Sequence, residues 1–177
     1  MPVRIFITFL FITIFCHLNA QKVIINGKEG NRPLVWADFT GSPDNSSPYF
    51  AYTYWSSKFS FSGARFNGDV AIIDGFECTL QLNPQESWVK PGKQSEELLK
   101  HEQGHFNVGL LYIKDVVKKI KAASFTRANY QAEIKAILNE AHKKYVEMGN
   151  RYDEETAHSS NREQQGKWNV FFSKELQ

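Results

Sequence analysis

The chain has 177 residues, with 21 Lys and Arg against 19 Asp and Glu and a formal net charge of +2. A balance this close to neutral gives no electrostatic argument for binding nucleic acid or an anionic membrane. The length allows one hydrophobic core of ordinary size and is too short for two. Any partner must therefore be inferred from a site and not from overall charge.

The first twenty residues are typical of an export signal. Arg4 precedes an apolar stretch over residues 5–15, and Ala20 stands before Gln21. Such a run is too short to span a bilayer but suits the central region of a cleaved signal peptide. Leu18 stands where a small residue is usual, so retention of the segment as a membrane anchor is the alternative. We expect a signal peptide over residues 1–20, one domain over residues 21–177, and a secreted or periplasmic protein without membrane contact after cleavage.

Cysteine usage excludes an internal disulfide. Cys16 leaves with the signal, so Cys78 is the only cysteine of the mature chain. Cys78 alternates with Phe76, Leu80 and Leu82, and we expect it to be a small buried hydrophobe and neither a nucleophile nor a ligand. The mature protein must then be stabilised by core packing or by a bound metal.

Residues 21–93 are expected to be rich in strands, because apolar and polar residues alternate there with a period of two. The alternating apolar positions are Phe50, Tyr52 and Tyr54, then Phe59 and Phe61, and then Phe76, Cys78, Leu80 and Leu82. The pattern predicts a small antiparallel sheet with one buried face.

Residues 94–177 are expected to be helical. Ser95 can cap a first helix, whose apolar face repeats at helical spacing from Phe106 to Ile120. A second helix is predicted from Thr126 to Gly149, and a third begins at a capping box formed by Ser160 and Glu163. Residues 151–159 would then be a polar connector. The fold class predicted is α+β, with the sheet packed on the first helix and the last two helices closing the site.

The motif with the clearest chemistry is His101-Glu102-Gln103-Gly104-His105. Two histidines four residues apart on a helix lie on one face, one turn from each other, and can bind one metal ion. The carboxylate of Glu102 points to the adjacent side, where it can reach a water in the open position of the metal and act as a general base. Gly104 is a poor helix former, which suggests a close approach by a strand or a substrate.

A catalytic zinc site needs a third protein ligand. His158 is the preferred candidate, because it lies in the predicted polar connector, where a ligand and its supporting groups could be assembled. Asp153, Glu154 and Glu140 are the alternatives. His142 lies one residue off the apolar stripe of its helix and is expected to be a solvated surface residue.

Two further residues of the connector are candidates for supporting roles. Tyr152 could donate a hydrogen bond to the oxyanion that forms when water adds to a carbonyl, although such a residue is more often a packed amphipathic side chain. Asp153 or Thr156 could orient a ligating imidazole.

The chain also resembles a family of predicted secreted zinc-dependent proteases from bacteria that is otherwise known as a domain of unknown function. The matching residues run through the mature chain in order: Trp36 to Phe39 with Gly41, Ser87 to Val89, His101 to Phe106, Tyr152 and Asp153 with Thr156 and His158, and Gln165 with Trp168. The resemblance implies a zincin-like fold, with His101, His105 and His158 as zinc ligands and Glu102 as the catalytic acid and base. One departure is that Ser159 stands where this family tends to have glycine.

These observations predict a zinc metallopeptidase that hydrolyses a peptide or protein substrate. Zinc would lower the pKa of a bound water towards about 7, and Glu102 would take the proton and pass it to the leaving amine. Three alternatives remain: a zinc amidase acting on cell-wall peptide, a binding module that zinc only stabilises, and a metal-free adhesion or carbohydrate-binding domain using the aromatics of residues 49–61. Those aromatics are expected to be core and sheet-face residues. The sequence does not indicate the oligomeric state.

Overall fold

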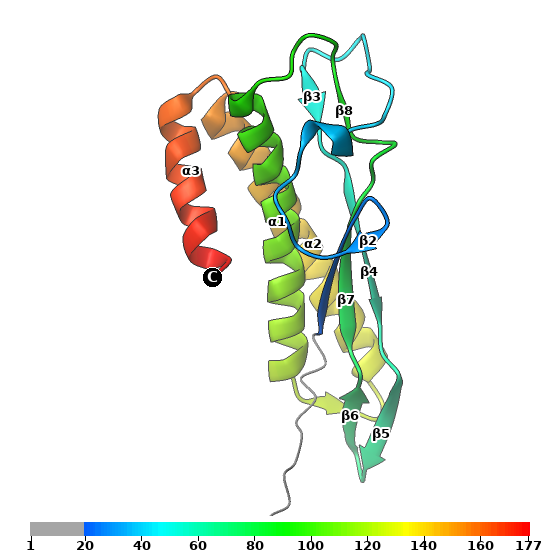
Figure 1. Ribbon diagram of the computed structural model, residues 1–177. Helices are drawn as coiled ribbons and strands as arrows, with labels where there is room; N and C mark the ends of the chain where they lie inside the picture. The colour runs from blue at the N-terminus through cyan, green and yellow to red at the C-terminus, as the bar shows by residue number, and fades with distance from the viewer. Residues whose placement is uncertain (1–19) are drawn as a thin grey trace, which may run out of the picture.

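The strands lie in the N-terminal part of the chain and three helices follow them, so the protein is a mixed α+β chain, as the sequence predicts. The computed structural model describes residues 20–177. Apart from Ala20, the predicted signal peptide over residues 1–20 lies outside these described residues. Figure 1 shows α1 running lengthwise between the strands on one side and α3 on the other, with α2 behind it.

The elements follow one another in this order: β1 (Gln21–Ile25), β2 (Lys28–Glu29), a 3-10 helix η1 (Trp36–Asp38), β3 (Ala51–Tyr52), β4 (Trp55–Ser60), β5 (Gly63–Asn67), β6 (Val70–Asp74), β7 (Glu77–Leu82), β8 (Trp88–Val89), α1 (Glu96–Ala122), β9 (Phe125–Thr126), α2 (Tyr130–Thr156) and α3 (Arg162–Glu175). The strands form a main sheet of order β2-β1-β7-β4 and two small sheets, β3-β8 and β5-β6-β9.

The main sheet is not purely antiparallel, and the prediction is wrong on this point. β4 pairs antiparallel with β7, with Trp55 opposite Leu82, but β1 pairs parallel with β7, with Gln21 opposite Cys78. Alternation along a strand identifies its two faces and carries no information on the direction of its neighbour. A parallel pair needs a long connection, and the whole of residues 26–76 separates these two strands.

Helix α1 is the central element of the core. Ser95 caps it by accepting a hydrogen bond from the backbone N–H of Leu98 at 3.1 Å, as predicted. A Cβ atom at Gly109 would lie 2.8 Å from Leu80, so the glycine allows the sheet to approach the helix closely. The largest side chains that are fully buried around this helix are Leu80, Leu82, Phe106, Ile113, Val116, Tyr152 and Phe172.

The second helix differs from its prediction at both ends. Thr126 lies in β9 opposite Val70, so α2 begins later, and the helix continues through Gly149 to Thr156. A glycine inside a helix costs only about 1 kcal/mol. Burial of Tyr152 and Thr156 beyond it outweighs that cost. The predicted connector of residues 151–159 is therefore mostly the last turns of α2.

The third helix begins one residue later than predicted. Its N-cap is Asn161, whose side-chain oxygen accepts from the backbone N–H of Gln164 at 3.2 Å. The predicted capping box of Ser160 and Glu163 is therefore wrong. Asparagine and serine are equally good N-caps, so composition alone did not distinguish the two positions.

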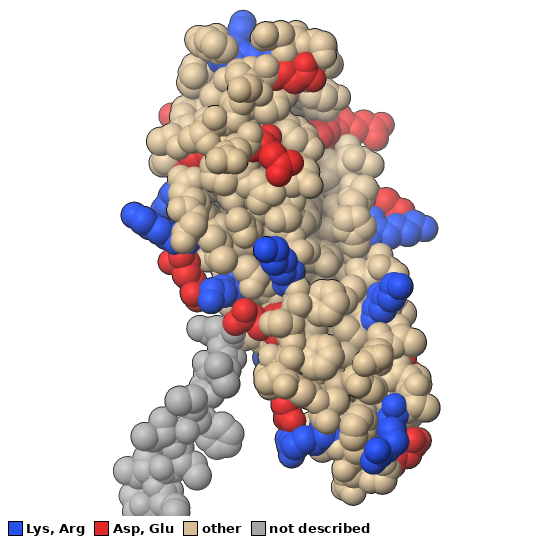
Figure 2. All heavy atoms as spheres, turned by 90° about the vertical axis from the view of Figure 1, so that its right-hand side faces the viewer, with Lys and Arg blue, Asp and Glu red and all other residues tan. Residues whose placement is uncertain are grey.

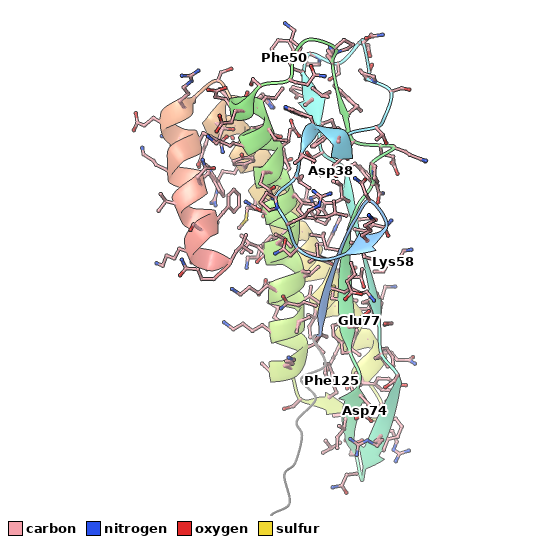
Figure 3. All side chains as sticks on the ribbon, in the orientation of Figure 1. Asp38, Phe50, Lys58, Asp74, Glu77 and Phe125 are labelled. Carbon is pink, nitrogen blue, oxygen red and sulfur yellow. The ribbon has the colours of Figure 1, made fainter. Side chains whose placement is uncertain are left out.

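Two predictions about apolar residues have opposite outcomes. Cys78 is buried as expected, and burial raises the pKa of its thiol to about 12, which leaves it an unreactive core residue. In contrast, Tyr49, Phe50, Tyr52 and Phe59 are 42 to 50% exposed, so they are not core residues. The buried positions of that alternation are Ala51 and Thr53, because alternation shows that two faces differ and not which one is inward. Figure 3 places Phe50 at one end of the molecule and Phe125 near the other.

Charged residues do not gather by sign on the strand side of the molecule, where Figure 2 shows Lys and Arg interspersed with Asp and Glu. None of the helices within residues 20–177 has the length and apolar composition needed to cross a membrane.

Candidate metal centre

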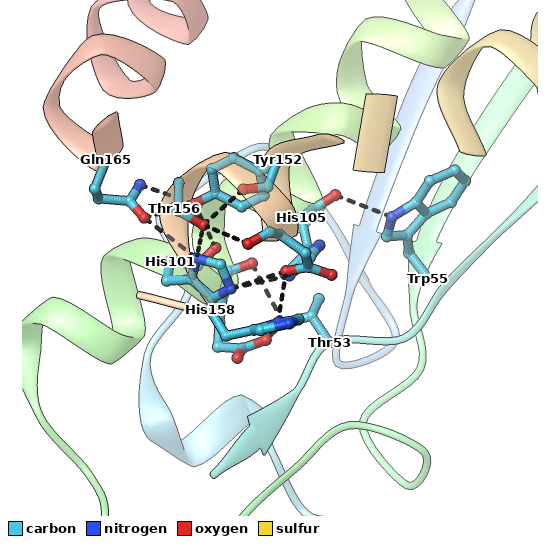
Figure 4. A network of polar contacts seen from close by, with 10 residues as sticks. Thr53, Trp55, His101, His105, Tyr152, Thr156, His158 and Gln165 are labelled. Atoms are coloured by element: carbon cyan, nitrogen blue, oxygen red, sulfur yellow. Dashed lines mark hydrogen bonds and ion pairs between the residues drawn. The ribbon is translucent and has the colours of Figure 1, made fainter. Parts of the chain in front are cut away.

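The N-terminal half of α1 and the last turn of α2 meet at one end of the molecule and bring four polar side chains together (Figure 4). His101 and His105 come from α1, Asp153 from α2, and His158 from the turn that follows α2. The motif histidines thus share one helix face, as predicted, and the other two donors approach that face from a segment about fifty residues later.

Four of the distances between these donor atoms are close to those expected around a single metal ion. Nε2 of His101 lies 3.2 Å from Nε2 of His105, and Oδ1 of Asp153 lies 3.2 Å from the first and 3.0 Å from the second. Nδ1 of His158 lies 3.4 Å from the same oxygen. Ligands about 2.0–2.1 Å from a tetrahedral zinc lie about 3.3 Å apart. His101, Asp153 and His158 form a group that could hold a metal ion, and His105 contacts two of its members.

The Asp153 carboxylate has surroundings that a cation would suit. Its Oδ1 is buried and receives no hydrogen bond of ordinary geometry from any described residue. Burial would raise the pKa of Asp153, yet the imidazoles of His101 and His105, which can donate to it when they are protonated, hold that pKa well below its usual range. Burial would likewise lower the pKa of His105, but its contact with Asp153 and the charge of Glu102 raise it. The site is therefore arranged around a negative oxygen that faces three imidazole nitrogens.

Glu102 is held on the adjacent side of α1. Its side chain is only 2% exposed, and its Oε2 accepts a hydrogen bond of 2.6 Å from the hydroxyl of Thr53. Thr53 lies between β3 and β4, so the strands orient this carboxylate. The backbone of α1 is fixed at the same level, because Trp55 donates a hydrogen bond of 3.0 Å to the carbonyl of His105.

A cavity of about 280 Å³ opens beside these residues. One side is lined by His101, Glu102, His105, Asp153 and His158, and the other by residues 48–53 with Leu98. The donors and the carboxylate of Glu102 thus face the same hollow, and its opposite wall is largely aromatic and apolar.

Tyr152 lies behind the donors and does not line this cavity. Its hydroxyl is fully buried and donates to the backbone carbonyl of His101 at 3.0 Å. Burial raises the pKa of Tyr152 well above its ordinary value. A Cβ atom at Gly104 would lie 2.1 Å from this hydroxyl, so the glycine in the motif is required by a tyrosine from α2. The contacts of Tyr152 indicate a role in holding α1 against α2, and its predicted role at an oxyanion stays a prediction.

The turn that carries His158 has an unusual backbone. Ala157, His158 and Ser159 all have positive φ, with values of 46°, 48° and 78°. This left-handed conformation is unfavourable for residues other than glycine and costs about 1–3 kcal/mol each in strained cases. Ser159, where the sequence departs from the family resemblance, therefore adopts the conformation that favours glycine. The His158 ring packs against Tyr49, with 4.4 Å between ring centroids.

The structure narrows the alternatives for the remaining ligand. Glu154 and His142 are exposed, and Glu140 pairs with Lys119 at 2.8 Å. None of these three belongs to the donor group found within residues 20–177. His158 and Asp153, which the sequence presents as alternatives, occupy the same site together.

Sequence reasoning missed the partners that orient the motif. Nδ1 of His101 lies 3.2 Å from Oε1 of Gln165 and 3.4 Å from the hydroxyl of Thr156. Thr156 was predicted as a possible orienting residue, but Gln165 and Thr53 were not. A buried glutamine and threonine carry no signal in composition or spacing, because their role depends on tertiary contacts.

Comparison with protein families identifies a match to the model described as "Bacterial protein of unknown function (DUF922)", over residues 37–159. The match covers both motif histidines, Glu102, Asp153 and His158, and it ends before α3. Searches of curated proteins and of solved structures found no match. Since the match spans well over half of the chain, the protein belongs to the DUF922 family of bacterial proteins.

Proposed function

We propose that this protein is a secreted or periplasmic zinc-dependent peptidase. His101, His105 and His158 would hold the zinc ion, and Glu102 would be the general base. The observation that supports the proposal most strongly is the convergence of imidazole nitrogens and a carboxylate oxygen at 3.0 to 3.4 Å, beside a buried glutamate that faces the same cavity.

The donor set favours zinc over other divalent ions. Imidazole nitrogen with one carboxylate oxygen suits zinc, whereas magnesium and calcium prefer oxygen ligands alone. A motif helix packed against a sheet is also compatible with a zincin-like arrangement, which we include in the proposal. When bound, zinc supplies a Lewis acid that makes a water more acidic and polarises a carbonyl group.

The chain's own residues then have defined tasks. Thr53 engages Oε2 of Glu102, and no described residue donates a hydrogen bond to Oε1. Oε1 would therefore take a proton from the attacking water and later return it to the leaving amine. The cavity wall of residues 48–53 would exclude bulk water and hold the substrate.

A substrate in extended conformation has one evident place to pair. Among the strands of residues 20–177, β3 is hydrogen-bonded only to β8, and its residues line the cavity. An unpaired edge of a strand can bind an extended peptide through backbone hydrogen bonds. We therefore expect a peptide to lie along β3 with its carbonyl group directed at the donors.

The test of this proposal is Glu102→Gln. The variant should bind zinc with wild-type stoichiometry and lose about 10²–10⁴-fold in peptide hydrolysis, because only the base is removed. His142→Gln, on the exposed surface of α2, is the matched control and should change neither quantity. Zinc binding without hydrolysis of peptides or cell-wall fragments by the wild-type protein would contradict the proposal, and hydrolysis of wall fragments alone would favour an amidase.

A second candidate function is a binding module in which zinc joins the helices. It is favoured by the presence of four protein donors, because a structural zinc site is closed by four ligands and a catalytic site keeps one position for water. Cobalt substitution separates the two candidates. A four-coordinate absorption spectrum that inhibitors of metallopeptidases do not change would favour the closed site, whereas a change on adding them would favour the enzyme.

A further inference from the structure

Helix α3 reaches the donor group at one residue, Gln165. This side chain is only 8% exposed and places its Oε1 3.2 Å from Nδ1 of His101, the ring nitrogen that does not face the other donors (Figure 4). α3 begins at Arg162, beyond residue 159 where the family match ends. A segment outside the matched region thus contacts the most buried of the three histidines.

The orientation of the Gln165 amide follows from its other contacts. Its Nε2 donates to the hydroxyl of Tyr152 at 2.8 Å and to the side-chain oxygen of Asn169 at 2.9 Å. The Tyr152 hydroxyl donates in turn to the carbonyl of His101 at 3.0 Å, so it is available to accept from Gln165. The Tyr152 hydroxyl also lies 3.1 Å from Oε1, so the donation from Nε2 to Asn169 is the contact that sets the amide orientation and leaves Oε1 facing His101.

The second neighbour of the same ring nitrogen is also an acceptor. Thr156 donates its hydroxyl hydrogen to the carbonyl of Tyr152 at 2.6 Å, which leaves its oxygen lone pairs facing Nδ1 of His101 at 3.4 Å. Two acceptors around Nδ1 require the proton to be on Nδ1. Nε2 then carries the lone pair and faces Asp153 and His105.

We propose that Gln165 is a positioning residue that fixes His101 as its Nδ1-protonated tautomer. The lone pair on Nε2 is then directed at the donor group before any metal arrives. Through Tyr152 the same amide joins α3 to the backbone of α1 and to α2. Rotation of the His101 ring would break its contacts with both Gln165 and Thr156. The inference rests on the metal-binding part of the proposed function, but the tautomer itself is a property of the metal-free protein.

The tautomer can be measured directly. Two-bond ¹H–¹⁵N correlation spectra of the chelator-treated mature protein, at a pH well above the ordinary imidazole value of about 6.5, distinguish the two neutral forms. We expect His101 to be protonated on Nδ1 in the wild type and to become a mixture of tautomers in Gln165→Leu. Protonation of the wild-type ring on Nε2 would overturn the inference, whether or not the protein hydrolyses peptides.

Zinc affinity gives the second readout. Gln165→Leu should weaken zinc binding about 10–100-fold in a competition assay with a chromophoric chelator, as loss of such a partner does elsewhere. Gln165→Glu keeps an acceptor at the same place and should restore affinity to within a few-fold of wild type. Gln164→Leu, the same change one residue earlier on α3, should leave affinity unchanged.

The two variants of Gln165 also guard against a misfolding artefact. If Gln165→Leu does not fold, the zinc affinity of Gln165→Glu and the tautomer of His101 in the wild-type spectrum still test the inference. Wild-type affinity in a folded Gln165→Leu, or loss of affinity in Gln165→Glu equal to that in Leu, would contradict a positioning role. A protein with the expected tautomer and zinc affinity but no peptide hydrolysis would contradict the proposed function and leave this inference standing.

Discussion

Two aspartates of this protein hold carboxylate oxygens inside the fold with opposite surroundings. Asp38, in η1, is only 1% exposed and accepts hydrogen bonds from the guanidinium of Arg32 at 2.6 and 2.7 Å, from the backbone of Val35 at 2.9 Å and from Asn26. Asp153 has a buried Oδ1 with no such donor, surrounded by imidazole nitrogens. Figure 3 places Asp38 in the same half of the molecule as Phe50 of the cavity wall.

The difference separates a structural carboxylate from one kept for a ligand. Asp38 is paired with an arginine, which keeps its charge at any physiological pH, and its oxygens are used within the fold. Asp153 faces groups that can bind a metal only when they are neutral. A buried polar atom without a partner is rare in folded proteins and needs an explanation. The explanation we propose is a cation that binds between Asp153 and the histidines, a place where His101, Asp153 and His158 could hold a metal ion.

The largest effect expected from this comparison is on stabilisation by zinc. At a free zinc concentration about 1,000 times the Kd, the wild-type protein should gain about 4 kcal/mol in free energy of unfolding. Asp153→Asn should lose most of this gain, because it removes the negative charge that faces the three imidazoles. Asp38→Asn should be less stable than the wild type both with and without zinc, but zinc should stabilise it by the full amount of about 4 kcal/mol. Urea denaturation with and without zinc measures all three, and equal gains in the two variants would remove the distinction between the carboxylates.

The next effect comes from moving α2 without changing a donor. Gly104→Ala places a methyl group 2.1 Å from the buried Tyr152 hydroxyl, so the ring or the whole helix must shift. We expect a loss of about 2–3 kcal/mol in stability and a weaker zinc affinity, because Asp153 is the next residue on α2. Gly149→Ala is the matched control: nothing lies within 4 Å of the added atom, and the change should stabilise the helix by up to about 1 kcal/mol. Thermal denaturation compares the two, and unchanged stability in Gly104→Ala would be inconsistent with the packing described.

The stabilisation of the fold by Asp38 should depend on pH. Burial alone would raise the pKa of Asp38, but Arg32 and the backbone of Val35 hold it below its usual range. A folded pKa lower than the unfolded value of about 3.9 means that the stabilisation is present above that pH and is lost as the pH falls through the folded pKa. Asp38→Asn should cost about 1–3 kcal/mol at pH 7.

The gap between wild type and Asp38→Asn should therefore narrow in acid. Urea unfolding of both proteins at neutral pH and at successively lower values below about pH 4 measures it. A gap that stays constant throughout this range would mean that the charge of Asp38 does not stabilise the fold.

The smallest effect concerns the turn that brings His158 to Asp153. Ser159 has a φ of 78°, so Ser159→Gly removes strain and should raise the free energy of unfolding by up to about 1 kcal/mol, with zinc affinity unchanged or slightly higher. Ser160→Gly, at the next position, where φ is not positive, should be neutral or destabilising. Thermal shifts in the opposite order would show that the left-handed conformation of this turn is not under strain.

Local patterns in the sequence predicted the parts of the site that depend on one helix. The spacing of His101 and His105, the cap at Ser95 and the burial of Cys78 follow from periodicity and composition alone. His158 was expected near the motif because it would lie in a polar connector. It does lie near the motif, but most of the expected connector is helical: Asp153 belongs to α2, and His158 follows the end of that helix. Spacing could not show that Asp153 and His158 reach the same point.

The remaining features depend on contacts between distant segments. The parallel pairing of β1 with β7, the exposure of Phe50 and Tyr52, and the contact of Gln165 with His101 each require knowledge of which elements pack together. Gly149 does not end the second helix, because the packing of Tyr152 and Thr156 stabilises the helix beyond it. Gly104 was recognised as unusual, but only the fold identifies Tyr152 as the cause.

The most direct test of the account is the metal content of the purified mature protein, measured by elemental analysis and native mass spectrometry for the wild type and for single replacements of His101, His105, His158, Asp153 and the surface residue His142. We expect one zinc ion per chain in the wild type and in His142→Ala, and a large loss of zinc in each of the other four variants. Folded wild-type protein that takes up no stoichiometric metal, or a His101→Ala variant that binds zinc as the wild type does, would contradict it.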